Sequence, residues 1–337
     1  MGSHENYQNS KTLVRRFYDA TEKASGDDLR AVFSEFVADD YHWRGMHPFY
    51  EQHGATAVVE TFWWPLRHAL KRLQRRQDIF MAGTNEIDGE SEWVCSMGHL
   101  MGLFDEDWLG IPPTGRIAFL PYCDFHRIVD ARIVETALFC DILSVMRQAG
   151  LNPLPAQTGA AILAPGPRTH DGLLFEPQNP AESEKTLALI NAMKDDLTNA
   201  EGFQSPDEEL ARTWHDDMLW FGPSGIGATY TIPRYQLQHQ GPFRQGLDNV
   251  EFQGHVCRFA EGDYAGWFGW PNLKMNPAGG FLGMPATDKT VEMRVVDIYR
   301  RDGDKLAENW IFIDILYFLK QTGLDVLERN RKAQDYR

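Results

Sequence analysis

The sequence has few cysteines, no long apolar run and a deficit of positive charge. The cysteines show neither the spacing of a metal site nor a short-range pairing, and there are only four of them: Cys95, Cys123, Cys140 and Cys257. No apolar run reaches the ~18 residues that a membrane helix needs, and the first residues lack the basic and apolar segments of a signal peptide. We therefore expect reduced, mostly buried thiols in a soluble, cytoplasmic protein that does not bind a membrane.

Acidic residues outnumber basic ones by 48 to 33, so the formal net charge is −15. Nucleic-acid backbones and anionic lipid surfaces both require clustered lysines and arginines. One basic cluster is present, at residues 71–76, and we interpret it as the solvated end of a helix. The charge balance therefore argues against a nucleic-acid partner.

An internal repeat is the strongest signal in the sequence. Residues 108–151 align without a gap with residues 281–324, at a constant shift of 173, and 14 of the 44 positions are identical. Upstream, a second motif recurs at a shift of 177, as Asp39-Asp40-x-x-Trp43-x-Gly45 and Asp216-Asp217-x-x-Trp220-x-Gly222. The change of shift indicates a loop that is four residues longer in the first copy.

Each copy begins with helical patterns. Apolar residues within 29–37 follow the i, i+3, i+4, i+7 spacing of a core-facing helix. Residues 205–208, Ser-Pro-Asp-Glu, have the order of an N-cap, a first helical Pro and a capping-box Glu. Earlier helices are predicted around 13–24 and 183–199. Both copies therefore start with a helical pair.

Strand patterns follow the helices. Residues 116–127 and 291–300 are rich in β-formers, and residues 133–143 and 306–316 follow as their hairpin partners. Helices followed by a run of antiparallel strands indicate an α+β class rather than βαβ units.

The segment between the copies is rich in proline. Residues 152–182 contain six prolines with several Gly and Ala, which excludes a long helix or a central strand. We therefore predict a first domain at residues 10–151, a linker at 152–182 and a second domain at 183–328. Because duplicated domains commonly keep the contact of a parent homodimer, we expect an internal pseudo-dimer, and leave a further homo-oligomer open.

The repeated motifs resemble the SnoaL-like polyketide cyclases. The resemblance rests on a Leu-Gly-x-Pro-x-Thr turn (residues 282–287), a strand with a central Asp (296–300) and a Glu-x-Trp-x-x-x-Asp strand (308–314). The first copy matches at residues 109–114, 123–127 and 135–141, but lacks the Trp. The resemblance implies the nuclear-transport-factor-like fold: two tandem cone-shaped α+β barrels, each a curved antiparallel sheet around N-terminal helices.

The family resemblance also implies an activity, a cofactor-independent intramolecular aldol cyclisation of the lyase/isomerase kind. Asp297, and Asp124 in the first copy, stand at the family's acid/base position. Burial in an apolar cone would raise the pKa of such a carboxyl and make it a better base near neutral pH. A salt-bridged Asp that closes a hairpin would fit the same position, and so would surface pairs or caps at Glu308 and Asp314.

Aromatic residues and histidines supply the other candidates. His239 precedes Gln240-Gly241-Pro242, where a helix should rim the second cone, and we count it as a catalytic candidate. Rings that could stack on a flat apolar or aromatic ligand are predicted as binding residues, together with one histidine of the first copy. They are Tyr264, Trp267, Trp270, Tyr299, Trp310 and His99.

Other functional classes have weaker support in the sequence. No pair of histidines has zinc spacing with a carboxylate, and Gly225-x-Gly227 does not follow a parallel strand, so we expect no metal and no cofactor. Two alternatives stay open. One is an epoxide hydrolase or dehydratase that uses Asp297 with Arg294 or Asp314, and the other is a non-catalytic binding module for apolar ligands.

Overall fold

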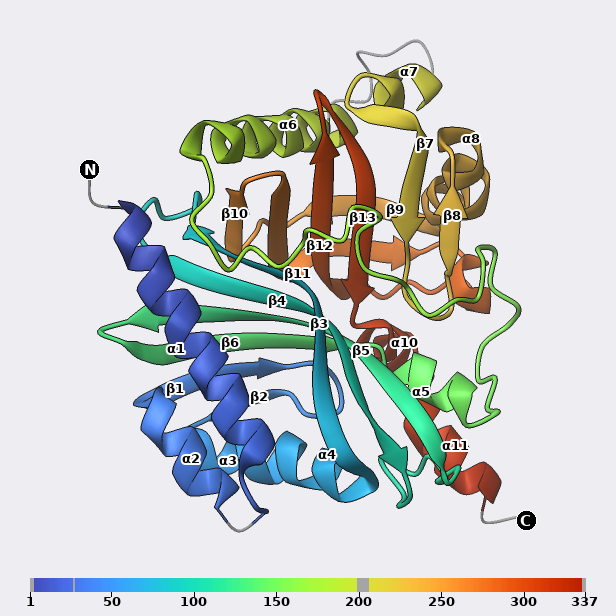
Figure 1. The fold of residues 1–337 in the computed structure, drawn as a ribbon. Coiled ribbons are helices and arrows are strands. Elements are labelled where there is room, and N and C mark those ends of the chain that lie inside the picture. The colour runs from blue at the N-terminus through green and yellow to red at the C-terminus, as the bar shows by residue number, and fades with distance from the viewer. Residues whose placement is uncertain (1–2, 27, 199–205, 335–337) are drawn as a thin grey trace. The chain divides into compact units, whose positions relative to one another are not determined.

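A computed structural model describes residues 3–26, 28–198 and 206–334. The chain divides into two compact units. Unit 1 consists of residues 1–153, 170–177 and 314–337, and unit 2 consists of residues 154–169 and 178–313. Each unit holds one sheet with helices packed on it (Figure 1).

Unit 1 contains the first repeat and the last helices of the chain. Its helices in the first repeat are α1 (Ser3–Lys23), α2 (Leu29–Phe36), α3 (Ala55–Val58), the π-helical turn η1 (Val59–Trp63), α4 (Trp64–Ala69) and α5 (Ile142–Gln148). Its strands are β1 (Val37–Gly45), β2 (Glu51–His53), β3 (Leu70–Thr84), β4 (Glu92–Phe104), β5 (Arg116–Val129) and β6 (Arg132–Cys140). From the end of the chain, α10 (Ile315–Gln321) and α11 (Val326–Gln334) belong to the same unit.

Unit 2 repeats this order of elements. Its helices are α6 (Pro180–Thr198), α7 (Pro206–Ala211), α8 (Ile232–Tyr235), the π-helical turn η3 (Gln236–Gln240), α9 (Gly241–Gly246) and the short 3₁₀ turn η4 (Phe281–Gly283). Its strands are β7 (Trp214–Phe221), β8 (Ala228–Tyr230), β9 (Leu247–Phe252), β10 (Cys257–Glu261), β11 (Tyr264–Pro277), β12 (Val291–Asp302) and β13 (Lys305–Ile313). The predicted N-cap Ser205 lies outside the described residues.

The two sheets share one topology, and the predicted α+β class is confirmed. The strand order is β2-β1-β6-β5-β4-β3 in unit 1 and β10-β11-β12-β13-β7-β8 in unit 2, where β9 also pairs with β11. Among these strands, only the pairs β1–β6 and β7–β13 are parallel, which departs from the predicted all-antiparallel sheet. Parallel pairing needs a long crossover, and the intervening helices and strands supply it. In both units the described strands form an open sheet rather than a closed barrel.

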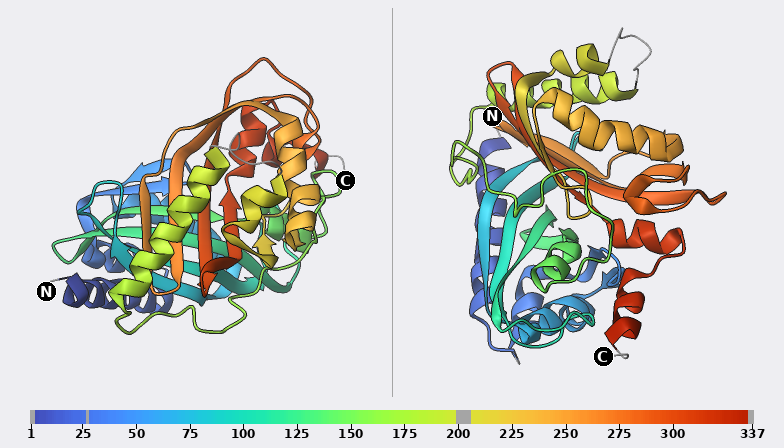
Figure 2. Two further views of the ribbon diagram at one scale, coloured as in Figure 1. Left: turned by 90° about the horizontal axis from the view of Figure 1, so that it is seen from above. Right: turned by 90° about the vertical axis from the view of Figure 1, so that its right-hand side faces the viewer.

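The first helix of each repeat crosses one face of its sheet. In unit 1, α1 runs across β3 and β4 (Figure 1), and in unit 2, α6 runs across β10 and β11 (Figure 2). The predicted apolar stripe of the next helix is confirmed in α2, where Leu29, Phe33 and Phe36 are buried. Burial of this stripe, rather than helix propensity, stabilises a helix of only eight residues.

Two predicted strands end earlier than the sequence indicated. The strands predicted at 133–143 and 306–316 end at Cys140 and Ile313, and helices α5 and α10 begin directly afterwards. Asp141 and Asp314 cause the change, because their carboxylates accept hydrogen bonds from the backbone N–H groups of Ser144 (2.9 Å) and Tyr317 (3.2 Å). An N-capping Asp satisfies an otherwise unpaired N–H and starts a helix. Asp314 is therefore a helix cap.

The structure explains the repeated Trp-x-Gly motif. In each copy the Trp ring folds over the glycine two residues later on the same face of the strand. A Cβ atom on Gly45 would lie 2.1 Å from Cζ3 of Trp43, and a Cβ atom on Gly222 would lie 2.1 Å from Cζ3 of Trp220. Only glycine leaves room for the buried ring at this position.

The units differ at the hairpin where the sequence predicts four extra residues. In unit 1, β3 is a continuous strand of 15 residues and its turn to β4 spans residues 85–91. In unit 2, the corresponding region is divided into β9 and β10, and only Gly262 and Asp263 join β10 to β11. The basic cluster at residues 71–76 lies within β3, so its interpretation as a helix end was wrong.

All four cysteines are buried and none forms a disulfide. In the described part of the chain, no helix combines the length and apolar character needed to span a bilayer.

Candidate active site

Asp297 lies near the middle of β12. It is paired with Trp267 on β11 and with Ile311 on β13. Because side chains alternate along a strand, Tyr299 shares the face of Asp297, and Asn309, which pairs with Tyr299, lies on that face as well. The structure therefore brings together three residues that the sequence proposed, Asp297, Tyr299 and Trp267, with one that it did not, Asn309.

The Asp297 carboxyl is buried among neutral groups. Nδ2 of Asn309 donates a hydrogen bond to its Oδ1 atom (3.0 Å), and the Tyr299 hydroxyl forms a second side-chain hydrogen bond. Among the described residues, no cation pairs with this carboxyl, so the predicted alternative of a salt-bridged hairpin Asp does not hold. Burial raises the pKa of Asp297 to about 7, against the two hydrogen bonds, which lower it.

Aromatic side chains surround this carboxyl. The Tyr299 ring lies 5.9 Å from Trp214 and 6.3 Å from Trp267, measured between ring centroids. Burial, and then the charge of Asp297, raise the pKa of Tyr235, which places Tyr235 within electrostatic range of the carboxyl. An uncharged aromatic site of this kind suits an apolar substrate better than an ionic one.

His239 lies in the π-helical turn η3, next to the ring of Tyr235. Its imidazole stacks on Trp220, with a centroid distance of 4.0 Å and an interplanar angle of 21°, and lies 5.4 Å from the Tyr235 ring. Burial lowers the pKa of His239 to about 3. A group with this pKa is a weak base at neutral pH, so the geometry favours Asp297 over His239 as the proton acceptor.

Three of the predicted binding rings lie elsewhere. Tyr264 pairs with Arg300, and Trp310 pairs with Ile298, which places both rings on the face of the sheet opposite to Asp297. Trp310 donates a hydrogen bond to the carbonyl of Pro165 (2.8 Å) there. Trp270 lies at the bulge of β11. The guanidinium carbon of Arg294 is 4.1 Å from the centroid of the Trp270 ring. The alternation of strand side chains separates these three rings from the carboxyl.

The hydrolase partners suggested for Asp297 have other contacts. Arg294 is three positions from Asp297 on β12 and therefore lies on the opposite face. Asp314 caps α10 and also accepts a hydrogen bond from the backbone of His47 (3.0 Å). Glu308 forms a buried ion pair with Arg300 and accepts hydrogen bonds from the backbone of Arg168 (3.1 and 3.3 Å).

Asp124 occupies the matching position in unit 1 but has charged neighbours. Arg75 donates a hydrogen bond to its Oδ2 atom (2.9 Å), Tyr18 donates one to Oδ1 (2.8 Å), and His126 Nε2 lies 3.4 Å from Oδ2. Burial raises the pKa of Asp124, but Arg75, followed by His126 and the hydrogen bonds, outweighs it and holds the pKa below its usual range. Asp124 is therefore a buried, paired carboxylate.

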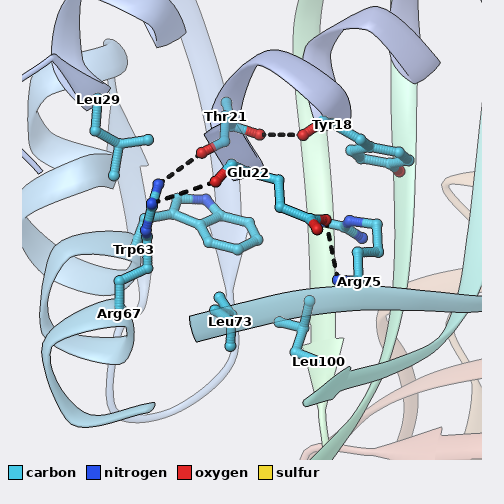
Figure 3. Close-up of a pocket in the computed structure, with 9 residues that line it drawn as sticks. All are labelled: Tyr18, Thr21, Glu22, Leu29, Trp63, Arg67, Leu73, Arg75 and Leu100. Carbon is cyan, nitrogen blue, oxygen red and sulfur yellow. Dashed lines mark hydrogen bonds between the residues drawn. The ribbon is translucent and has the colours of Figure 1, made fainter. Parts of the chain in front are cut away.

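A small pocket of unit 1 lies beside this ion pair (Figure 3). It encloses about 350 Å³, including its opening to solvent, and Tyr18, Trp63 and Arg75 line it. The guanidinium carbon of Arg75 lies 3.8 Å from the Tyr18 ring centroid and 5.6 Å from that of Trp63. Arg67, on the other side, donates to the carbonyls of Thr21 and Glu22 at the end of α1 (Figure 3). Both cations thus already have protein partners.

His99 does not reach this group. Asp124 pairs with Ser96 on β4, and His99, three residues farther along, lies on the opposite face. There its Nδ1 atom is 3.2 Å from Asp78 Oδ2. Among the described residues, no three His, Cys, Asp or Glu side chains are grouped as a metal site would require.

Sequence reasoning missed Asn309, Arg75, Tyr18 and Tyr235. The repeat alignment contained a signal for Asn309, because it matches Thr136 at the shift of 173 and directly follows the repeated Glu. Arg75 was noticed only as part of the basic cluster. Its contact with Asp124, 49 residues away, depends on the pairing of β3, β4 and β5.

Comparison with known proteins identifies the family. The family model described as SnoaL-like polyketide cyclase matches residues 12–149 and 272–322, which together make up more than half of the chain. The chain belongs to the SnoaL-like polyketide cyclase family. Each repeat contributes to the match, and the family supports a function of the cyclase or isomerase type.

Several solved structures are similar to part of this chain. A SnoaL-like polyketide cyclase from Jannaschia sp. CCS1 is 23% identical, with 44% of this chain and 94% of that one covered and a TM-score of 0.33. IdmH, described as a polyketide cyclase from Streptomyces antibioticus, is 18% identical over 42% and 97% of the two chains, with a TM-score of 0.34. An NTF2-like protein from Burkholderia xenovorans LB400 is 12% identical over 42% and 98%, also with a TM-score of 0.34. No curated protein matches the sequence significantly.

Proposed function

We propose that unit 2 is a cofactor-independent cyclase or isomerase in which Asp297 is the acid/base, and that its substrate is an apolar, polyketide-like carbonyl compound. The contrast between the two matched carboxyls carries this proposal. Asp124 is held as a carboxylate by Arg75, whereas Asp297 lies among neutral hydrogen-bond donors and aromatic rings. Only Asp297 is therefore poised to gain and lose a proton near neutral pH.

The proposed reaction is a proton transfer coupled to carbon–carbon bond formation. The Asp297 carboxylate removes a proton from a carbon next to a substrate carbonyl, and the electron pair of the C–H bond forms an enolate. The enolate carbon attacks a second carbonyl carbon of the same molecule. The proton on Asp297 then moves to the oxygen of the attacked carbonyl, which regenerates the carboxylate. The balance requires no oxidant, reductant or added group.

Two neighbours of Asp297 support this role. Asn309 donates to Asp297 Oδ1 and also to the carbonyl of Ile298 (3.0 Å each), so its amide is fixed from two sides. Asn309 holds Oδ1 of the carboxyl, and the Tyr299 hydroxyl forms a second hydrogen bond with the same carboxyl. Asn309 is therefore a positioning residue, which orients the carboxyl without adding a charge.

The first experiment compares Asp297→Asn with Asp124→Asn. Aromatic polyketide methyl esters are the first substrates to try, because the family match points to them and the rings near Asp297 can stack on them. General acid–base help contributes about 10²–10⁴-fold, so kcat of Asp297→Asn should fall by about that factor with little change in KM. Asp124→Asn should change kcat of the folded protein only a few-fold.

A pH profile separates a catalytic from a structural carboxyl. In the wild type, kcat/KM should rise with an apparent pKa near 7, because the base must be ionised. The residual activity of Asp297→Asn should not show this rise of kcat/KM with pH. Thermal unfolding of the variant should show that it is folded. Unchanged turnover in Asp297→Asn would remove this residue from the mechanism, and loss of folding would assign it a structural role.

A further inference from the structure

A polar residue in unit 2 replaces an aromatic residue in unit 1 at the same place in the fold. His239 matches Phe62 at the shift of 177, and both lie in a π-helical turn between two α-helical segments. The two residues therefore occupy the same place in the repeated fold, and their surroundings can be compared directly.

In unit 1, Phe62 belongs to a closed cluster of rings. Its centroid lies 4.9 Å from Phe49, 6.5 Å from Trp108 and 5.6 Å from Trp43, and Phe49 lies 6.1 Å from Trp108. Phe62 is completely buried. These rings pack against one another.

In unit 2, smaller residues stand at the corresponding positions. Ile226 matches Phe49 at the shift of 177, and Phe281 matches Trp108 at the shift of 173. Together with His239, these two residues line a pocket of about 580 Å³, its mouth included. Residues 154–158, from the segment between the repeats, form another part of the wall. The cavity itself measures about 160 Å³, and an apolar cavity of about 150 Å³ can hold a benzene-sized molecule.

The chemistry of the walls restricts the ligand. None of the lining residues carries a charge, apart from the ionisable imidazole of His239, and most are apolar. Burial holds the pKa of His239 near 3, so this imidazole is neutral at physiological pH. The pocket therefore favours an uncharged, largely apolar molecule.

His239 supplies one unsatisfied polar atom. Its Nδ1 atom is buried and has no hydrogen-bond partner among the described residues, while stacking on Trp220 fixes the plane of the ring. A buried polar atom without a partner lowers the stability of the protein. A neutral imidazole has one nitrogen that carries no proton and accepts hydrogen bonds. Because the His239 ring lines the pocket, the hydroxyl group of a ligand can donate a hydrogen bond to it.

We propose that this pocket binds an uncharged aromatic alcohol, with the ring between Ile226 and Phe281 and the hydroxyl hydrogen-bonded to the imidazole of His239. The site is specific to the tandem chain, because the segment between the repeats forms part of it. The inference does not depend on the role proposed for Asp297.

The experiment measures binding of 2-naphthol and naphthalene to the full chain at pH 7, by fluorescence or calorimetry. One hydrogen bond contributes about 0.5–1.5 kcal/mol, so 2-naphthol should bind about 2- to 12-fold more tightly than naphthalene. His239→Phe installs the residue of unit 1 and should abolish this preference. Ile226→Phe retains His239 but fills the pocket, and should weaken both probes about tenfold or more.

Phe62→His is the matched control, because it makes the reciprocal change in unit 1. It should leave both affinities unchanged. Equal binding of the two probes to the wild type, or a hydroxyl preference that survives His239→Phe, would overturn the role of His239. Full binding in a folded Ile226→Phe variant, or no binding to the wild type at millimolar probe, would overturn the site. Turnover by Asp297 variants is a separate measurement, so the two proposals can fail independently.

Discussion

Asp124 and Asp297 occupy the same position in two sheets of the same topology, but their surroundings differ. Asp124 has a buried cation, Arg75, and its pKa lies below the usual range. Asp297 has an amide and a phenol as partners, and its pKa is about 7. The neighbours on the strand differ as well, since His126 in unit 1 corresponds to Tyr299 in unit 2.

The difference between Asp124 and Asp297 shows how the same residue can have different roles in two copies of a domain. A buried carboxylate that is paired with a cation stabilises a fold but exchanges its proton only at low pH. The same carboxyl among neutral donors destabilises the fold at neutral pH and is available for proton transfer. The two copies thus contain one residue in two electrostatic states, and each can be disturbed separately.

The largest effect on stability is expected from Arg75→Met. It leaves Asp124 buried without its cation, and removal of one partner of a buried ion pair typically costs about 3–5 kcal/mol. Urea unfolding should show this loss. The double variant with Asp124→Asn should recover much of it, because the uncompensated charge is removed. A loss below about 1 kcal/mol would mean that solvent reaches Asp124 and that the two carboxyls are less different than the structure indicates.

The second largest effect on stability is expected from Asp297→Asn, and it depends on pH. Between about pH 4 and pH 7 the folded protein holds a proton on Asp297 that the unfolded chain has lost, so this group lowers stability as the pH rises. A change of pKa from about 3.9 to about 7 corresponds to at most about 4 kcal/mol. Asp297→Asn should therefore be more stable than the wild type at pH 8 and nearly equal to it at pH 4.

Asp124→Asn is the counterpart in this pH experiment. Because the folded pKa of Asp124 is lowered, its contribution to stability is present above the unfolded pKa and is lost as the pH falls through the folded pKa. Asp124→Asn should therefore be destabilised at pH 8 and approach the wild type in acid. Thermal unfolding at both pH values checks the two signs, and the same sign in both variants would contradict the comparison.

The smallest loss of stability is expected from replacing the repeated glycine, and it should be the same in both units. Gly45→Ala and Gly222→Ala each place a Cβ atom 2.1 Å from a buried Trp ring, so the ring must move. Overpacking of this kind costs about 1–3 kcal/mol. Because the local geometry is repeated, we expect similar losses in the two variants, measured by urea unfolding. A large difference would show that the units also diverge where their sequences agree.

The sequence allowed the repeat, the α+β class and the family to be predicted, because identical residues at constant shifts do not depend on tertiary contacts. It also indicated that Asp297, Tyr299 and Trp267 belong to one site. It placed Tyr264 and Trp310 beside them wrongly. Tyr264 is three residues from Trp267 on β11 and therefore lies on the other face, while the face of Trp310 depends on the register between β12 and β13. It extended two strands through Asp141 and Asp314, where capping carboxylates start helices instead.

The duplication and the position of the two carboxyls on their strands follow from the sequence by itself, because both are properties of residue order. Tertiary structure alone decided what each carboxyl does. Arg75 reaches Asp124 only through the pairing of three strands, and in the described part of the chain no cation pairs with Asp297. Likewise, the pocket at His239 arises because Ile226 and Phe281, distant in sequence, meet where unit 1 has larger rings. Charge and volume act over a few ångströms in space, so the final fold determines their effect.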